Sequence, residues 1–336
     1  MKTKFVHFFV IFSFLFLSAC GTSPRPPYSK PNPTISTGES NTPTFSGKIF
    51  THPGSSRDGA TLHAVIVADT NDSSVGKSVK VDLTNMQSLL GDISRHTGLA
   101  TAGKSVSGRE LSRGNVMTAI NSLSIKSNDV VIFYYSGHGF NPGNSKWPGM
   151  DLKNGRLTLK KVRNTLQQKN PRLLIVIADT CNGFTRGAEG GFRYSKAAEK
   201  QKNYRELFLK YRGTITASSS KPGQFSRGNK IIGGYYTDAL LINLSKELAS
   251  LNRPSWQALM KRANKPITKD GFLQEPQSKV QVEYRGNTPT TQIQQTPHVE
   301  VSPGQDATIT CQSYFKESGQ ECCRLTNGQK RCWADD

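Results

Sequence analysis

A histidine and a cysteine directly follow two apolar segments of this chain, and together they could carry out nucleophilic chemistry. His138 stands between two glycines near the end of "VVIFYYSGHGF" (130–140), and Cys181 ends "LLIVIADTC" (173–181). A free thiol is mostly protonated near neutral pH, because its pKa is about 8.5. A neighbouring imidazole can take up this proton and leave a reactive thiolate. The pair therefore predicts a nucleophile and its base, although an isolated buried cysteine is also typical of inert packing.

The elements that must position this pair are long buried strands. Near-continuous apolar runs predict strands at 62–68, 129–135, 172–178 and 213–218. The segment after Leu273 predicts a final edge strand. Apolar residues at helical spacing predict helices at 79–96, 110–123, 158–168 and 236–249. Apolar strands alternating with amphipathic helices are typical of a mostly parallel sheet with helices on both faces, so the sequence predicts the α/β class.

Polar residues follow three of these strands at the point where each ends. They read "ADTND" after the first strand, "SGHG" after the second and "DTCNG" after the third. In open α/β sheets, functional groups collect beyond the carboxyl ends of the strands. The glycines beside His138 allow the chain to turn and its N–H groups to approach a ligand. We therefore expect a functional site at this edge of the sheet.

These segments resemble those of a known family. "VVIFYYSGHG" and "LLIVIADTC" are similar to the histidine and cysteine segments of the caspase-like cysteine peptidases, in particular of metacaspases and their bacterial relatives. "VDLTNMQSLL" (81–90) is similar to the family's helix that opens with an aspartate, and "YYTDALL" (235–241) resembles the segment just after the active site. The resemblance covers about residues 60–285 and implies a caspase-like fold and peptide-bond hydrolysis.

The resemblance also implies roles for individual residues. Cys181 would attack the scissile carbonyl, while His138 would act as base and then donate a proton to the leaving amine. The backbone N–H groups of Gly139 and Cys181 would form the oxyanion hole. The family has a cysteine-type endopeptidase activity, so the expected partner is a protein or peptide substrate.

Three further positions match the metacaspase pocket that binds a basic side chain: Asp82, Ser136 and Asp179. Two carboxylates would hold a guanidinium by charge-assisted hydrogen bonds, so the resemblance implies cleavage after arginine or lysine. The alternative is that Asp82 caps its helix and that Asp179 only orients the loop.

The chain departs from the family after the nucleophile, where metacaspases usually continue with histidine, serine and glycine. Here the sequence reads Asn182-Gly183-Phe184. Two alternatives to an active enzyme therefore stay open. The first is a catalytically inactive caspase-like lipoprotein that binds peptides or envelope partners, and the second is a structural or adhesive lipoprotein.

The basic segment 184–213 follows the predicted nucleophile, and in the caspase-like family this region often carries processing sites. Self-processing would use a basic residue there, and the candidates are Arg186, Arg193, Lys196 and Lys200. A solvated basic loop and helix is the alternative.

The beginning of the chain predicts a lipoprotein signal peptide over residues 1–19. Two lysines precede an apolar run (5–17) that is shorter than the ~20 residues of a membrane span. "LSAC" resembles the lipobox of bacterial lipoproteins, which implies cleavage before Cys20 and a lipid on its sulfur; a cleaved signal that leaves Cys20 free is the alternative. Gly21 is not the aspartate associated with inner-membrane retention. We expect a lipid-anchored protein of the bacterial cell envelope, in the outer membrane rather than the inner.

The rest of the chain divides by composition. Proline, serine and threonine dominate residues 20–57, which predicts a flexible tether. Residues 58–285 suit one large peptidase domain, and residues 286–336 form a linker and a cysteine-rich tail.

The chain is strongly basic, with a formal net charge of +20. Its basic residues are dispersed and no aromatic-interleaved motif accompanies them, which argues against nucleic-acid binding and favours attraction to anionic envelope surfaces. No EF-hand pattern or dense acidic cluster indicates calcium, although some metacaspases need it. We expect no cofactor and no metal.

Four of the six cysteines lie in the tail: Cys311, Cys322, Cys323 and Cys332. An exported protein can form disulfides, so these four predict two bridges of open connectivity. Zinc is the alternative, but no C-x-x-C spacing is present. With Cys20 acylated and the tail cysteines paired, this count leaves Cys181 as an unpaired thiol.

Overall fold

The computed structural model describes residues 47–54, 59–143, 145–182, 199–269 and 272–286, together with three strands near the C-terminus. The predicted signal peptide, Cys20 and most of the predicted tether lie outside these residues. So does the segment 183–198, which includes three of the four predicted processing sites. In the part of the chain that the structure describes, no helix is both long and apolar enough to cross a membrane.

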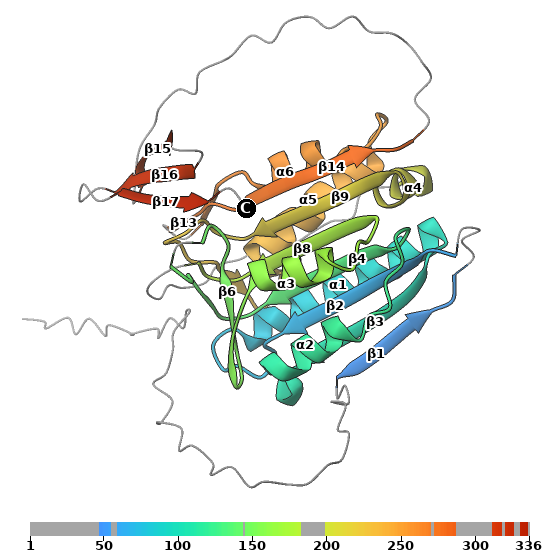
Figure 1. The fold of residues 1–336 in the computed structure, drawn as a ribbon, viewed down its shortest axis with the longest axis horizontal. Coiled ribbons are helices and arrows are strands. Elements are labelled where there is room, and N and C mark those ends of the chain that lie inside the picture. Colours follow the sequence, from blue (N-terminus) through green and yellow to red (C-terminus); the bar gives the residue numbers. More distant parts are fainter. Residues whose placement is uncertain are drawn as a thin grey trace, which may run out of the picture.

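A seven-stranded sheet forms the centre of the molecule (Figure 1). Its strands lie in the order β1-β3-β2-β4-β8-β9-β14. The inner strands run parallel, while the edge strands β1 and β14 are antiparallel to their neighbours. The bounds are β1 Lys48–His52, β2 Thr61–Ala68, β3 Ala100–Ser107, β4 Val130–Ser136, β8 Leu173–Asp179, β9 Tyr211–Ser218 and β14 Gln277–Tyr284.

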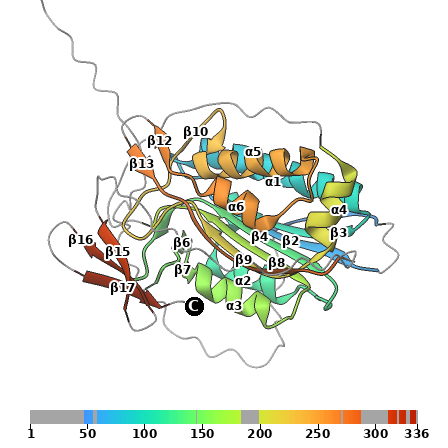
Figure 2. The same ribbon diagram turned by 90° about the horizontal axis from the view of Figure 1, so that it is seen from above.

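Helices cover both faces of this sheet (Figure 2). One face packs against α1 (Gly76–Thr97), α4 (Gln201–Leu209), α5 (Tyr235–Ala249) and α6 (Trp256–Ala263). The other packs against α2 (Arg113–Asn121) and α3 (Leu159–Gln167), and a short 3-10 helix, η1 (Gly108–Glu110), precedes α2. Because side chains alternate along a strand, Ile66 of β2 enters the first core and Val67 the second. This burial on both faces explains the continuous apolar runs of the inner strands.

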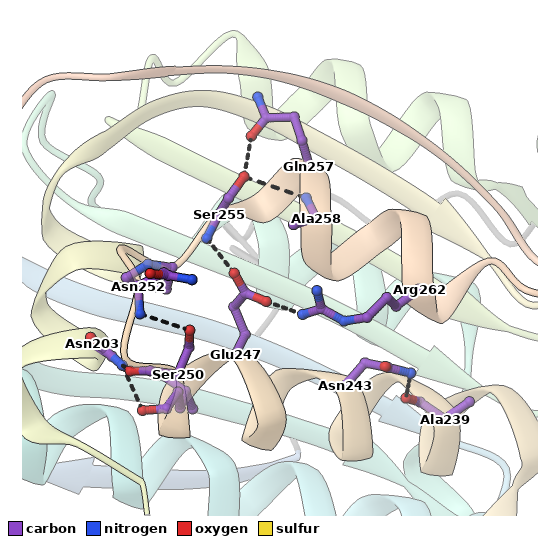
Figure 3. Close-up of polar contacts among 12 residues, drawn as sticks. Asn203, Ala239, Asn243, Glu247, Ser250, Asn252, Ser255, Gln257, Ala258 and Arg262 are labelled. Carbon is purple, nitrogen blue, oxygen red and sulfur yellow. Dashed lines mark hydrogen bonds and ion pairs between the residues drawn. The ribbon is translucent and has the colours of Figure 1, made fainter.

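Partly buried polar contacts hold α4, α5 and α6 together (Figure 3). Glu247 of α5 accepts a hydrogen bond from the N–H of Ser255 (2.7 Å), just before α6, and forms an ion pair with Arg262 of α6. Asn203 of α4 donates through Nδ2 to the carbonyl oxygen of Ser250 (2.8 Å). This layer fixes α5, whose first turn reaches the carboxyl end of the sheet.

The smaller sheets lie at the end of the molecule toward which the arrows of β2 and β9 point (Figure 1). They are β5–β6–β7 (Gly139–Phe140, Gly149–Leu152, Gly155–Thr158), β10–β11 (Gly228–Asn229, Gly233–Gly234), β12–β13 (Ile267–Lys269, Phe272–Gln274) and β15–β16–β17 (Cys311–Glu317, Gln320–Leu325, Lys330–Ala334). The last sheet belongs to the predicted tail. Both views place it at this same end (Figures 1 and 2).

The strands and helices that the sequence predicts are present, with ends shifted by a few residues. Two strands of the central sheet, β1 and β3, were not predicted, and neither were the short strands of the smaller sheets. In β3, most of residues 100–107 are small or polar and half of the positions are only partly buried, so no continuous apolar run marks this strand. The predicted tether 20–57 is too long, since Lys48–His52 forms β1. This strand pairs with β3, and its Phe50 packs on the core while most of its residues are exposed, as is usual for an edge.

Candidate active site

Two neighbouring parallel strands bring the loops of His138 and Cys181 together. β4 and β8 pair in register, so that Ser136 lies opposite Asp179 at their carboxyl ends. One step beyond, Thr180 donates from Oγ1 to the carbonyl oxygen of Gly137 (2.7 Å). The predicted meeting of these two strand ends is therefore present in the fold.

The glycines on either side of His138 are required by close packing. Gly137 has a φ of +156°, and a Cβ there would lie 2.7 Å from Oη of Tyr135. A Cβ on Gly139 would overlap Oγ1 of Thr180 and lie 2.6 Å from the carbonyl oxygen of Cys181. Only glycine lets the turn after β4 approach the end of β8 this closely.

His138 lies in a largely buried position, its side chain 14% exposed, and one of its ring nitrogens is fully engaged. Nε2 lies 3.2 Å from Oδ1 of Asp72 and 3.1 Å from Oγ of Ser74. Burial opposes the charged imidazolium, but the hydrogen bond to Asp72 and the charges of Asp72, Asp69 and Asp151 outweigh it. Together they raise the pKa of His138 above its ordinary value.

Cys181 follows β8 and is 2% exposed, with Sγ 3.5 Å from the carbonyl oxygen of Ser226. It is disulfide-bonded, and no cysteine among the described residues is free. The prediction of an unpaired Cys181 is therefore wrong. That prediction paired cysteines by their closeness in sequence, whereas a disulfide requires only that two cysteines lie close in space. The other five cysteines lie outside the residues whose side chains are described.

Asn182, where metacaspases usually have histidine, is completely buried and joins three loops. Its Nδ2 donates to the carbonyl oxygens of Lys146 (3.0 Å) and Ser220 (3.3 Å), and its Oδ1 accepts from Nδ2 of Asn141 (2.8 Å). Its backbone N–H donates to the carbonyl oxygen of Gln224 (2.9 Å). This departure from the family pattern therefore supports the loop around Cys181.

The other predicted site residues, Asp82, Ser136 and Asp179, form a buried acidic pair with one hydroxyl. Oδ2 of Asp82 accepts a hydrogen bond from Oγ of Ser136 (2.6 Å), and its Oδ1 accepts one from the N–H of Gly234 (2.8 Å). Oδ2 of Asp179 accepts from the N–H (3.0 Å) and the hydroxyl (2.7 Å) of Thr237. The two carboxylates thus both contact the junction of β11 and α5.

Burial and mutual repulsion shape the electrostatics of this acidic pair. Asp82 is 1% and Asp179 is 5% exposed. Burial, together with the negative charge of Asp179, raises the pKa of Asp82 well above its ordinary value. Burial also raises the pKa of Asp179, although hydrogen bonds from Ser226 and Thr237 oppose the shift. None of the ion pairs among the described residues involves Asp82 or Asp179, so the pair has no cation there.

The structure decides against Asp82 as a helix cap. α1 begins at Gly76 after Val75, so Asp82 lies inside the helix, and its carboxylate contacts other elements. Asp179 does contact loop residues, since its Oδ1 accepts a hydrogen bond from Oγ of Ser226 (2.5 Å).

Several residues of the site were not predicted. Asp72 and Ser74 follow β2, and the strand-end pattern "ADTND" was the signal that could have found the first of them. Ser226 and Gly234 carry no sequence signal, because they approach the acidic pair only through the fold. Thr237 lies in "YYTDALL", the segment that resembles the family but to which no role was given.

Asp69, Asp72 and His138 each place one ligand-type atom within 4.8 Å of the others. Nε2 of His138 already faces Asp72 and Ser74 at hydrogen-bond distance.

A model of the caspase domain matches residues 62–295, which is more than half of the chain. The chain belongs to the caspase family. At the level of this family it is a cysteine peptidase whose substrates are proteins. The caspase-like α/β fold predicted from the sequence, a mostly parallel sheet with helices on both faces, is confirmed.

Two solved structures are similar to this caspase-family chain. One is a protein from Geobacter sulfurreducens, 16% identical, with 65% of this chain and 92% of that one covered. The other is caspase-1 from Spodoptera frugiperda, 14% identical, with 66% and 88% covered. Each has a TM-score of 0.43. No curated protein matches the chain, so the family assignment depends on the domain model.

Proposed function

We propose that this chain is a cysteine endopeptidase that cleaves after arginine or lysine. His138 and Cys181 are the catalytic pair. The observation that carries the specificity is the acidic pair Asp82 and Asp179, which is buried without a cation among the described residues and lies beside the strand ends that carry His138 and Cys181.

A basic side chain is the ligand that this acidic pair favours. Burial, and then repulsion by the Asp179 carboxylate, raise the pKa of Asp82, so a negative charge on both groups is unfavourable without a cation. A guanidinium or ammonium group would supply the missing positive charge. It would donate charge-assisted hydrogen bonds to both carboxylates. An aspartate side chain would add a third negative charge, so aspartate before the scissile bond should be rejected.

The chemistry at the catalytic pair follows from thiolate attack. The Cys181 thiolate adds to the scissile carbonyl, the C–N bond breaks, and the leaving amine takes the proton from His138. Water, deprotonated by His138, then hydrolyses the thioester and restores the thiol.

The N–H of Gly139 supports an oxyanion hole in this reaction. The N–H of Asp151 donates to the carbonyl oxygen of His138 (2.9 Å), so the next pair in this antiparallel ladder, Gly139 and Met150, is a non-hydrogen-bonded one. At such a position the N–H of Gly139 points away from β6 and is available to the oxygen of a bound carbonyl.

The disulfide at Cys181 makes this form of the protein latent, because only a thiolate is nucleophilic. A dithiol reductant would convert the bridge into two thiols and become a disulfide itself. Catalysis is therefore expected only after reduction.

We also propose that residues 1–19 are a lipoprotein signal and that Cys20 carries the lipid anchor. Tethering would keep the basic domain at a cell-envelope membrane. Labelling with a fatty-acid probe in the producing cells should mark the wild type and not Cys20→Ser. Equal labelling of both would reject the anchor.

The central test compares fluorogenic peptides that end in arginine, lysine or aspartate, with a dithiol reductant present. The wild type should cleave the first two, whereas Cys181→Ala and His138→Ala should not, and both variants should keep the wild-type circular dichroism spectrum. Turnover by Cys181→Ala at the wild-type rate would reject the catalytic pair. Preference for aspartate would reject the basic specificity.

A further inference from the structure

We infer that Asp72 is a positioning residue for His138: it holds the Nε2 side of the ring and thereby leaves Nδ1 as the nitrogen that exchanges protons with Cys181. This inference builds on the proposed peptidase function. Asp72 lies in the loop between β2 and α1, and Oδ1 is 3.2 Å from Nε2 of His138.

The imidazole geometry sets the tautomer. A carboxylate can only accept a hydrogen bond, so the ring must present an N–H at Nε2 to Asp72. In the neutral ring, the lone pair is then on Nδ1, which makes Nδ1 the basic nitrogen. An imidazole without such a partner would distribute its proton between the two nitrogens.

The backbone around Asp72 fixes the carboxylate in turn. Oδ1 accepts hydrogen bonds from the N–H groups of Ser74 (2.7 Å) and Val75 (3.0 Å) and from Oγ of Ser74 (2.5 Å). These donors precede α1, which begins at Gly76, and a helix N-terminus favours a negative charge. The carboxylate is thus pre-oriented before any substrate arrives.

The charges agree with this geometry. The hydrogen bond from His138 is the largest influence on Asp72, and with those from Ser74 and Val75 it outweighs burial and keeps the pKa of Asp72 well below its usual range. Asp72 therefore stays ionised wherever the catalytic pair works. The charges of Asp69 and Asp151 also raise the pKa of His138, and Asp72 is the acid whose hydrogen bond to the ring contributes to this shift.

Two variants, Asp72→Asn and Asp72→Ala, distinguish a role of Asp72 in orienting His138 from a role in holding the loop alone. Asn can still accept the hydrogen bonds from Ser74 and Val75, because Asn and Asp are equally good at helix N-termini. It loses the charge that holds the imidazolium. Asp72→Ala loses both the negative charge and the acceptor for the hydrogen bonds from Ser74 and Val75. A structural role alone predicts a wild-type-like Asp72→Asn.

A matched control is Asp151→Asn. It removes one negative charge that also raises the pKa of His138, but Asp151 pairs with Arg156 at 3.8 Å and has no hydrogen bond to the His138 ring among those described. Its kcat should remain within about twofold of the wild type, because surface charges contribute little on their own.

The experiment measures kcat, KM and the imidazole ¹⁵N chemical shifts of the reduced protein, with the His138 signals assigned by their loss in His138→Gln. A positioned acid–base group typically contributes about 10²–10⁴-fold to the rate. If Asp72 positions His138, Asp72→Asn should lower kcat by at least about tenfold, with little change in KM. Positioning also predicts a lower His138 pKa in both variants and loss of the Nε2–H preference in Asp72→Ala, because Oδ1 of an asparagine can still accept a hydrogen bond from Nε2–H.

Unchanged tautomer and pKa of His138 in both variants would overturn the inference, whatever happens to kcat. The chemical shifts do not depend on turnover. If the wild type cleaves no peptide, the proposed function fails, while the shifts still decide whether Asp72 sets the state of His138.

Discussion

The carboxylates of Asp82 and Asp179 converge on one glycine, Gly234. The N–H of Gly234 donates to Oδ1 of Asp82 at 2.8 Å across 152 residues of sequence. A Cβ on Gly234 would overlap Oδ2 of Asp179 and lie 3.2 Å from Oδ2 of Asp82. Residue 234 must therefore lack a side chain for the two carboxylates to approach the backbone this closely.

Gly234→Ala should displace the carboxylate of Asp179, and with it the geometry of the acidic pair. Gly234 has φ −65° and ψ 136°, which alanine adopts without strain, so the effect would come from the added methyl group alone. We expect at least a tenfold loss in kcat/KM for arginine peptides and a stability loss of about 1–3 kcal/mol, which is typical of overpacking. Peptide kinetics and denaturant unfolding measure the two effects.

Gly91→Ala is the control for that substitution. Gly91 lies inside α1 and a Cβ there would have nothing within 4 Å. Alanine should leave the kinetics unchanged and stabilise the protein by about 0.5–1 kcal/mol, because glycine is a poor helix former. If Gly234→Ala behaves like Gly91→Ala, the acidic pair is not the substrate site.

Removing either carboxylate should weaken cleavage after basic residues. A hydrogen bond to a charged group contributes about 1.5–3 kcal/mol, so Asp82→Ala and Asp179→Ala should each lower kcat/KM for arginine peptides about 10- to 150-fold. Peptides ending in a neutral residue should lose less. Unchanged arginine cleavage in both variants would contradict the basic specificity.

The stability of the fold should depend on pH through Asp82. Its pKa is raised by burial and by Asp179, so the protonated carboxyl stabilises the folded state and this contribution is lost as pH rises through the folded-state pKa. The Tm of the wild type should therefore fall above the ordinary carboxyl range, and Asp82→Asn should show a smaller fall. Thermal scans from about pH 4 to about pH 8 compare them. Parallel curves would argue against a strained acidic pair.

Cys181 should react with alkylating agents only after reduction. In the disulfide-bonded state its sulfur cannot be alkylated, and it is also buried. Peptide mapping should find Cys181 linked to another cysteine without reductant, and modified by iodoacetamide with concomitant loss of peptidase activity after dithiol treatment. Labelling of Cys181 without reductant would contradict the disulfide. The map also tests whether the tail forms two bridges of its own, since a tail cysteine bound to Cys181 would prevent that.

Self-processing after a basic residue remains a prediction for Arg186, Arg193, Lys196 and Lys200. Three of them lie outside the described residues, and Lys200 precedes α4. The reduced wild type should yield fragments that Cys181→Ala does not, and intact-mass measurement would identify the cut. Identical masses for the two proteins would reject self-processing.

The sequence by itself determined the inner strands and the two residues at their ends. β2, β4 and β8 are buried on both faces, so each must be apolar at nearly every position, and such runs are visible without a structure. Parallel neighbours end at the same edge, which is why the convergence of His138 and Cys181 could be predicted.

Only the tertiary structure decided which groups surround those ends. Asp72 faces His138 and Gly234 faces Asp82 through contacts between elements that are distant in sequence, and Cys181 is disulfide-bonded. The half-exposed strands β1 and β3 also escaped prediction, because they need few apolar residues. Burial leaves a periodic pattern in a sequence, whereas a single hydrogen bond or disulfide between remote loops leaves none.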